Sequence, residues 1–205
     1  MKNRWPEICH HTLYAPPLGP GSVVLDLGAS TAAFSTALAE RFGCLCHAVE
    51  GLPENFQRIR ESARVRRHHF VMCGRDETVD FQPVSGHFQS GTVALSPGQV
   101  AAADAISVLG ASLDGLVEHL GLTRIDPLKV DIEGAEIEMF ENASDAVLAS
   151  CAQITVEFHD FMAPDLTPAV RAVLARLEAL GFRSIRFTRR FHGDVLFVNP
   201  ARIGL

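Results

Sequence analysis

The chain has 205 residues, of which 47% are hydrophobic, and its formal net charge is −6. This length and apolar content suit one domain with a substantial core. The negative charge opposes nonspecific binding to the phosphate backbone of nucleic acids and to an acidic membrane surface. The number of cysteines, 5, is odd, and several of them lie in apolar runs, so we expect reduced thiols and a cytoplasmic location.

Residues 1–21 form an irregular lead-in, with room for a short helix before Pro16 and for a role in covering one edge of the site. They contain no continuous apolar segment. We therefore expect neither a signal peptide nor a membrane span.

A strand, a tight turn and a helix come next. The apolar run 23–27 suits a strand buried on both faces, and Gly28 permits a left-handed backbone or the close approach of a ligand. Apolar residues then recur at helical spacing over residues 31–42. Gly43 stands where a left-handed residue would end that helix.

A second strand and helix repeat this arrangement. Residues 45–49 predict a strand that ends at Glu50, and Pro53 begins a helix. We interpret the basic run 58–69 as the solvated end of this helix and the turn after it. Residues 69–73 predict the third strand.

The middle of the chain is less regular. Residues 78–81 and 106–109 are short strand candidates, and residues 113–120 predict a helix. The segment 82–104 is rich in turn residues and contains one more strand candidate, at 92–95. A loop of this length is often a substrate cover.

The last part returns to strands separated by helices. The clearest helix has Thr167 as its cap and ends at Gly181, and the final two strands are joined by a turn short enough to make them antiparallel. Strands that alternate with helices indicate an open α/β sheet. The strands expected here are 127–132, 153–158, 184–187 and 195–198.

Polar side chains follow the parallel strands where each strand ends. They are Asp26 and Gly28, Glu50, Asp131 and Glu133, and Glu157 with His159. Ligands bind at this rim of an open α/β sheet. Glu50, about 20 residues after the glycine turn, suits a bidentate hydrogen bond to two ribose hydroxyls. The turn has a single glycine after an acid, which lacks the phosphate cradle of NAD sites and suits a cationic amino-acid group.

These residues resemble the class I S-adenosylmethionine-dependent methyltransferases. The segment 128–136, Leu-Lys-Val-Asp-Ile-Glu-Gly-Ala-Glu, is similar to the signature of the FkbM-type subgroup, and residues 156–159 and 197–199 strengthen the resemblance. It implies a three-layer, doubly wound, mostly parallel seven-stranded sheet with an antiparallel last strand, in a single methyltransferase domain over residues 22–205. It also implies O-methylation of a hydroxyl on a sugar, a polyketide or another small metabolite.

The chain departs from the family pattern at two positions of the cofactor site. Ala32 stands where a second glycine is usual, and Gly51 follows Glu50 where proline is common. Alanine is small enough for close helix packing, so we expect binding to survive. The cofactor-binding residues implied by the resemblance are Asp26, Gly28, Ala29, Ser30, Thr31, Glu50, Gly51, Cys73 and Asp131.

Catalysis on a hydroxyl needs a base or a metal, because the protonated hydroxyl is a weak nucleophile. His159 is the candidate base, with Glu157 beside it, and Asp131 and Glu133 are expected next to the methyl group. These four residues are also a candidate Mg²⁺ site, since hard oxygen ligands suit that ion.

Three other functions remain open at this point. One is a cofactor-binding module without catalysis. Another is a nucleic-acid methyltransferase, which only the basic run supports. The third is an NAD-dependent oxidoreductase, which the glycine pattern disfavours. The sequence does not identify the acceptor, the need for a metal, or the oligomeric state, for which a homodimer is one option.

Overall fold

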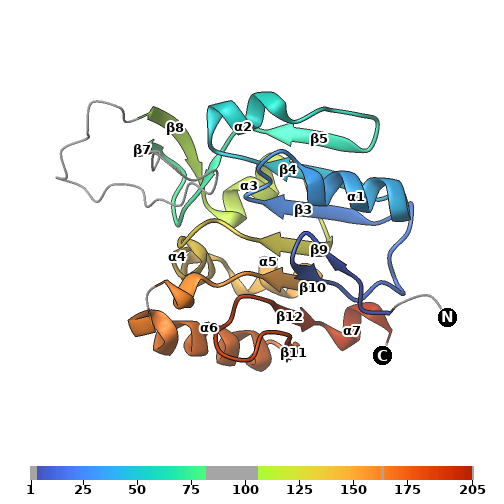
Figure 1. Cartoon of the computed structure of the whole chain (residues 1–205), viewed down its shortest axis with the longest axis vertical. Coiled ribbons are helices and arrows are strands. Elements are labelled where there is room, and N and C mark those ends of the chain that lie inside the picture. The colour runs from blue at the N-terminus through green and yellow to red at the C-terminus, as the bar shows by residue number, and fades with distance from the viewer. Residues whose placement is uncertain (1–3, 82–105, 163, 205) are drawn as a thin grey trace.

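The computed structural model describes residues 4–81, 106–162 and 164–204, and its elements form layers around one central sheet (Figure 1). The expected cover loop at 82–104, with its strand candidate at 92–95, lies outside these residues and stays a prediction. Seven strands make up the central sheet, in the order β11-β12-β10-β9-β3-β4-β5. Their bounds are β3 Val23–Leu27, β4 Leu45–Val49, β5 Val65–His68, β9 Ile125–Val130, β10 Cys151–Val156, β11 Arg183–Arg186 and β12 Val195–Val198.

The sheet is doubly wound and mostly parallel. The strands from β5 across to β10 pair in parallel, whereas β12 is antiparallel to both of its neighbours. From β3 the chain builds outward through β4 and β5 and then returns to add β9 and β10 on the other side. The strand order therefore reverses between β3 and β9, which is where such sheets bind ligands. The predicted fold class, with its antiparallel last strand, is confirmed.

Helices cover both faces of the sheet because the central strands bury side chains on both sides. Leu25 and Leu27 of β3 belong to a cluster completed by α3 to α6, and Val24 belongs to a second cluster completed by α1. Near the antiparallel edge, Ile203 of α7 packs on Leu196 and Val198 of β12. The helices are α1 Ala33–Phe42, α2 Pro53–Arg58, α3 Leu113–His119, α4 Glu136–Asn142, α5 Asp145–Ser150, α6 Thr167–Ala179 and α7 Pro200–Ile203, and two 3-10 turns lie at His159–Phe161 and Pro164–Leu166.

Two smaller sheets flank the central one. Near the N-terminus, β1 (Glu7–Ile8) and β2 (His11–Thr12) form an antiparallel hairpin. A second sheet has the order β6-β8-β7, from β6 (Val71–Met72), β7 (Thr78–Phe81) and β8 (Ile106–Ala111). The hairpin replaces the irregular lead-in and short helix expected before Pro16, so that expectation was wrong.

The third strand of the central sheet is β5, at Val65–His68. The strand predicted at 69–73 is present only as β6, Val71–Met72, and belongs to the smaller sheet. The prediction was wrong because β5 is an edge strand with charged residues. The Arg67 guanidinium lies over the Phe56 ring, 4.7 Å from its centroid, and donates to the Phe56 carbonyl at 3.2 Å. Part of the basic run is therefore strand rather than a solvated helix end.

Two helix starts also differ from the expectation. Helix α1 begins at Ala33 rather than Thr31, after Ala32 in the left-handed region with φ of 61°. Thr167 is the first residue of α6 and not its cap, and its hydroxyl donates to Asp160 Oδ2 at 3.1 Å. The left-handed residue at Gly43 is as predicted, and α6 ends close to Gly181, as expected.

Within the described part of the chain, no helix has both the length and the apolar content needed to span a membrane.

The turn after β3 packs directly against the end of β9. Gly28 has φ of 73°, and a Cβ built there would lie 1.7 Å from the Asp131 carbonyl oxygen. Its N–H and that of Ala29 donate to the Val49 carbonyl at 3.0 and 2.9 Å, which fixes the turn against β4. Only glycine fits this position, for steric as well as conformational reasons.

The Gly28→Ala variant should therefore lose at least about 3 kcal/mol of unfolding free energy, because the methyl group would displace the β9 backbone. The matched control is Gly121→Ala, since Gly121 also has positive φ, 64°, but nothing lies within 4 Å of its Cβ position. We expect that control to lose only about 1 kcal/mol. Urea unfolding measures both, and equal losses would show that the contact with Asp131 is unimportant.

Candidate active site

The carboxyl ends of the parallel strands open into a cavity of about 430 Å³. Its walls come from the segments after β3, β4, β9 and β10, as the strand-order reversal requires. A volume of this size is typical of a small-molecule site. The lining residues with polar side chains are Cys9, His10, Ser30, Glu50, Asn55, Cys73, Asp131, Glu133, Glu138, Glu157 and His159.

Glu50 is fixed by two backbone donors. Ser30 N donates to Oε2 at 2.8 Å and Leu52 N donates to Oε1 at 2.7 Å, and the residue is 8% exposed. Burial raises the pKa of Glu50, although the two donors oppose that rise. Because each carboxylate oxygen accepts more than one hydrogen bond, both keep a free lone pair toward the cavity. This geometry fits the two adjacent hydroxyls of a ribose.

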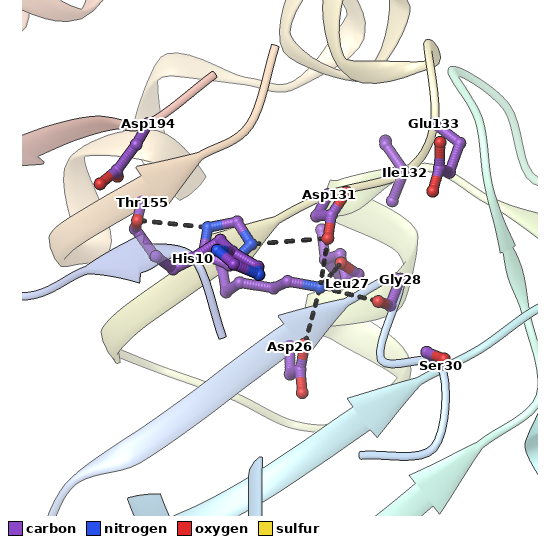
Figure 2. Close-up of polar contacts among 12 residues, drawn as sticks. His10, Asp26, Leu27, Gly28, Ser30, Asp131, Ile132, Glu133, Thr155 and Asp194 are labelled. Atoms are coloured by element: carbon purple, nitrogen blue, oxygen red, sulfur yellow. Dashed lines mark hydrogen bonds and ion pairs between the residues drawn. The ribbon is translucent and has the colours of Figure 1, made fainter. Parts of the chain in front are cut away.

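A buried lysine joins the ends of β3 and β9 below this cavity. Lys129 Nζ lies 3.3 Å from Asp26 Oδ1 and 3.4 Å from Asp131 Oδ2, and it donates to the carbonyls of Leu27 and Gly28 at 3.2 and 2.7 Å. Figure 2 shows these contacts converging on one ammonium group. Burial disfavours the charge, but Asp26 and Asp131 outweigh it and raise the pKa of Lys129.

Asp26 does not line the cavity, in contrast to its predicted role as a cofactor contact. It is 0% exposed, and its Oδ2 accepts from the Ser35 hydroxyl at 2.7 Å. The carboxylate faces Lys129 and Ser35 within the protein and is absent from the cavity lining, so the acid supports the turn rather than contacting a ligand.

His159 lies between two glutamates at the end of β10. Its Nδ1 is 2.9 Å from Glu136 Oε1, and its Nε2 is 3.2 Å from Glu133 Oε2 and 4.0 Å from Asp131 Oδ1. Burial works against the charged ring, but the hydrogen bonds to Glu133 and Glu136 prevail and raise the pKa of His159 to about 10. The ring is therefore an imidazolium at neutral pH in this arrangement.

Glu136 holds the loop that carries Glu133. It is 2% exposed and accepts from the backbone N–H groups of Ile132 and Gly134 at 3.1 Å, as well as facing His159. Within this loop Glu133 has φ of 54° and Gly134 has φ of 103°. A glutamate in the left-handed region is strained, and such strain persists only where neighbouring contacts hold it.

Glu157 completes the polar end of the cavity. Burial, followed by the nearby charge of Asp131, raises the pKa of this carboxyl. Asp131 behaves in the opposite way. Burial opposes its ionisation, but a hydrogen bond from His11 and the charges of Lys129 and His159 hold the pKa of Asp131 well below its ordinary range. Two neighbouring acids thus differ in their readiness to take a proton.

Most of the predicted site residues do meet in this cavity. All the predicted catalytic residues line it, as do Gly28, Ser30, Glu50, Gly51 and Cys73. Ala29 is buried outside the lining, and Thr31 lies in a separate surface hollow with Arg58 and Arg64. Sequence reasoning gave no role to Glu136, although it belongs to the quoted signature, and it missed Cys9, His10, His11, Phe161 and Met162.

Two overlapping sets of side chains have the spacing of cation ligands. Their ligand atoms lie within 4.8 Å of one another, and the sets share Asp131. They are His11, Asp131 and Glu157, and Asp131, Glu133 and His159. The carboxylates of both sets are ligands of the type that Mg²⁺ prefers, whereas His159 would have to lose its proton before it could bind a metal. The predicted Mg²⁺ site stays a prediction.

The doubly wound sheet, the glycine turn and the carboxylate at the end of β4 together define a Rossmann-like nucleoside-binding domain. A family model described as the methyltransferase FkbM domain matches residues 26–184. The chain therefore belongs to the FkbM methyltransferase family, as the sequence predicted. Membership also confirms the predicted cofactor, S-adenosylmethionine, and the geometry of Glu50 fits its ribose.

Other similarities are partial or distant. The AMB antimetabolite synthetase AmbE of Pseudomonas aeruginosa is 46% identical over 48 residues, which are 23% of this chain and 2% of that protein, so the chain spans a small fraction of that relative. Among solved structures, the fibrillarin pre-rRNA processing protein of Methanococcus jannaschii is 14% identical, with a TM-score of 0.49. The match covers 89% of this chain and 67% of the fibrillarin chain. The precorrin-6y C5,15-methyltransferase of Geobacter metallireducens is 17% identical with a TM-score of 0.46, covering 88% and 80%.

The charge of His159 should be visible by NMR. We expect its Cε1–H resonance to stay at the imidazolium position from pH 6 to 9 and to titrate near pH 10, and Glu136→Gln should lower that midpoint. Because the folded-state pKa is raised above the ordinary value, the stabilisation is complete below about pH 6.5 and is lost as pH rises toward 10. A midpoint near 6.5 in the folded protein would contradict this arrangement.

Proposed function

We propose that the chain is an S-adenosylmethionine-dependent O-methyltransferase that acts on a hydroxyl of a small molecule. The observation that carries the proposal is the division of one cavity into two parts. A ribose-type carboxylate, Glu50, lies at the end of β4, and a cluster of Asp131, Glu133, Glu157 and His159 lies at the ends of β9 and β10. The switch point between β3 and β9 separates the two parts.

The Glu50 side of the cavity suits the nucleoside. Val49, Phe70 and Met72 line the cavity on this side of the switch point and offer an apolar wall for a purine ring. Glu50 can accept hydrogen bonds from both ribose hydroxyls without losing its own backbone donors. When bound, S-adenosylmethionine supplies an electrophilic methyl group.

The other side of the cavity suits activation of a hydroxyl. His159 already carries its proton at neutral pH in this arrangement, which makes it a poor base, so the proposal moves that role to Glu157. Its raised pKa makes this carboxylate a better proton acceptor than an ordinary glutamate. Glu157 would take the proton of the acceptor hydroxyl as its oxygen attacks the methyl carbon, and His159 would orient Glu133 beside them.

The charge of the lining supports a small acceptor over a nucleic acid. Its described part contains five acids, Glu50, Asp131, Glu133, Glu138 and Glu157, and neither lysine nor arginine. Such a surface repels phosphate groups. In the basic run, Arg67 is already engaged with the Phe56 ring and carbonyl.

Glu50→Gln should weaken binding of S-adenosylmethionine about 10- to 100-fold, because a charged acceptor of two hydroxyl hydrogen bonds is lost. Isothermal titration calorimetry measures this. Glu54→Gln is the matched control, since Glu54 is an exposed acid of α2, and it should bind as the unmodified protein does. Unchanged affinity in Glu50→Gln would remove Glu50 from the cofactor site.

Glu157→Gln should lower kcat about 100-fold or more, because the amide accepts no proton, and should change the affinity for S-adenosylmethionine by less than about twofold. The assay measures S-adenosylhomocysteine released with a panel of hydroxyl-bearing sugars and polyketides. Glu141→Gln, at an exposed position of α4, is the control. Cofactor binding without product from any acceptor would instead support a binding module without catalysis.

A further inference from the structure

The N-terminal hairpin lies outside the part of the chain that the family model matches. Strands β1 and β2 precede residue 26, where the match begins. Nevertheless, the two residues of the hairpin turn, Cys9 and His10, line the same cavity as Glu50 and Asp131. The cavity is therefore completed by a segment that the matched domain does not include.

The hairpin turn has an unfavourable backbone for its sequence. Ile8 pairs with His11, so Cys9 and His10 form a two-residue turn, and their φ angles are 48° and 66°. Turns of this shape favour glycine and asparagine. Two strained residues persist only where surrounding contacts hold them in place.

Those contacts come from the antiparallel side of the sheet. Thr12 donates to Asp194 twice, from its backbone N–H at 3.2 Å and from its hydroxyl at 2.6 Å. Tyr14 N donates to Gln153 Oε1 at 2.8 Å, and Gln153 Nε2 donates back to the Tyr14 carbonyl at 3.0 Å. The hairpin (dark blue in Figure 1) and Tyr14, which follows it, are thus docked through four hydrogen bonds to buried partners.

His11 extends from this docked strand to the active site. The residue is 0% exposed, its Nε2 lies 3.5 Å from Asp131 Oδ2, and its Nδ1 lies 3.5 Å from the Thr155 hydroxyl. Dashed lines at Thr155 and Asp131 in Figure 2 mark these two contacts, and Lys129 Nζ in turn lies between Asp131 and Asp26. The edge of the ring packs on Phe34, with centroids 5.8 Å apart.

We propose that His11 is a positioning residue of the active site, which the N-terminal hairpin delivers to hold the Asp131 carboxylate toward the reacting end of the cavity. His11 and Lys129 contact the same oxygen of Asp131, Oδ2, while Oδ1 is the oxygen nearer His159. Contacts to Oδ2 from two directions fix the rotation of the carboxylate. Its other oxygen then has one orientation toward the cavity.

A structural role alone does not account for the histidine. A buried imidazole must find hydrogen-bond partners to offset its desolvation, and an apolar ring would fill the same volume at lower cost. Here both ring nitrogens face polar atoms on the ends of two different strands. The expected effect of His11 on kcat rests on the proposed methyl transfer. The contacts of His11 with Asp131 and Thr155 do not depend on that proposal.

The test compares His11→Phe with His11→Gln. Phenylalanine keeps a ring against Phe34 and removes the contact to Asp131, whereas the glutamine amide nitrogen reaches the place of Nε2. We expect His11→Phe to lower kcat about 10- to 100-fold with KM for S-adenosylmethionine within about twofold, and His11→Gln to recover most of that loss. Ser150→Ala is the control, because it removes a part-buried hydrogen bond of 2.7 Å to the Val147 carbonyl just before β10, at the end of that strand away from the cavity.

Full kcat in folded His11→Phe would overturn the proposal. If His11→Phe does not fold, His11→Asn replaces it, since the asparagine amide falls short of Asp131. Asparagine should then give a kcat at least about tenfold below glutamine, and equal values would overturn the proposal.

An NMR arm separates this proposal from the proposed function. In the unmodified protein, the ¹⁵N spectrum of His11 should show a proton on Nε2 at neutral pH that exchanges slowly with water, as expected for a donor to Asp131. If no hydroxyl acceptor is methylated, the proposed function fails and this spectrum alone decides the positioning claim. A ring protonated only on Nδ1 would overturn it.

Discussion

The site depends on one buried cation, the Lys129 ammonium group. It is 4% exposed and contacts two carboxylates and two backbone carbonyls that belong to the ends of β3 and β9. Removing one partner from a buried ion pair leaves an uncompensated charge, which commonly costs about 3 to 5 kcal/mol. The same ammonium that joins the two strands therefore also fixes the turn at Gly28 and the carboxylate of Asp131.

Two cations, Lys129 and the His159 imidazolium, explain why several acids can lie close together at one site. Carboxylates that share a small volume repel one another, and one of them would take up a proton unless cations lie between them. Lys129 lies between Asp26 and Asp131, and the His159 imidazolium lies between Glu133 and Glu136. Glu157 has no such close cation among the described ion pairs, and its pKa is raised. The arrangement thus leaves one carboxylate available as a proton acceptor.

The central sheet was predictable because its strands carry strong local patterns. The apolar runs that became β3, β4, β9, β10 and β12 were each found within a few residues, since strands buried on both faces admit few polar side chains. The prediction failed at β5, where an edge strand bears Arg66 and Arg67, and at the hairpin, where two-residue strands have no periodicity to detect. The positions of Glu50 and Asp131 at the rim of the sheet were predictable, because each follows directly after a recognisable strand. The roles of Asp26, His11 and Glu136 did not, because they depend on partners that tertiary folding brings together.

The central claim is that Glu50 binds the ribose of the methyl donor and thereby directs the methyl-bearing sulfur toward the cluster around Asp131. A crystal structure with S-adenosylhomocysteine tests it most directly. The account predicts that both ribose hydroxyls lie within hydrogen-bond distance of the Glu50 carboxylate and that the sulfur faces the space between Asp131, Glu157 and His159. A ribose bound away from Glu50, or a sulfur directed away from that cluster, would contradict it.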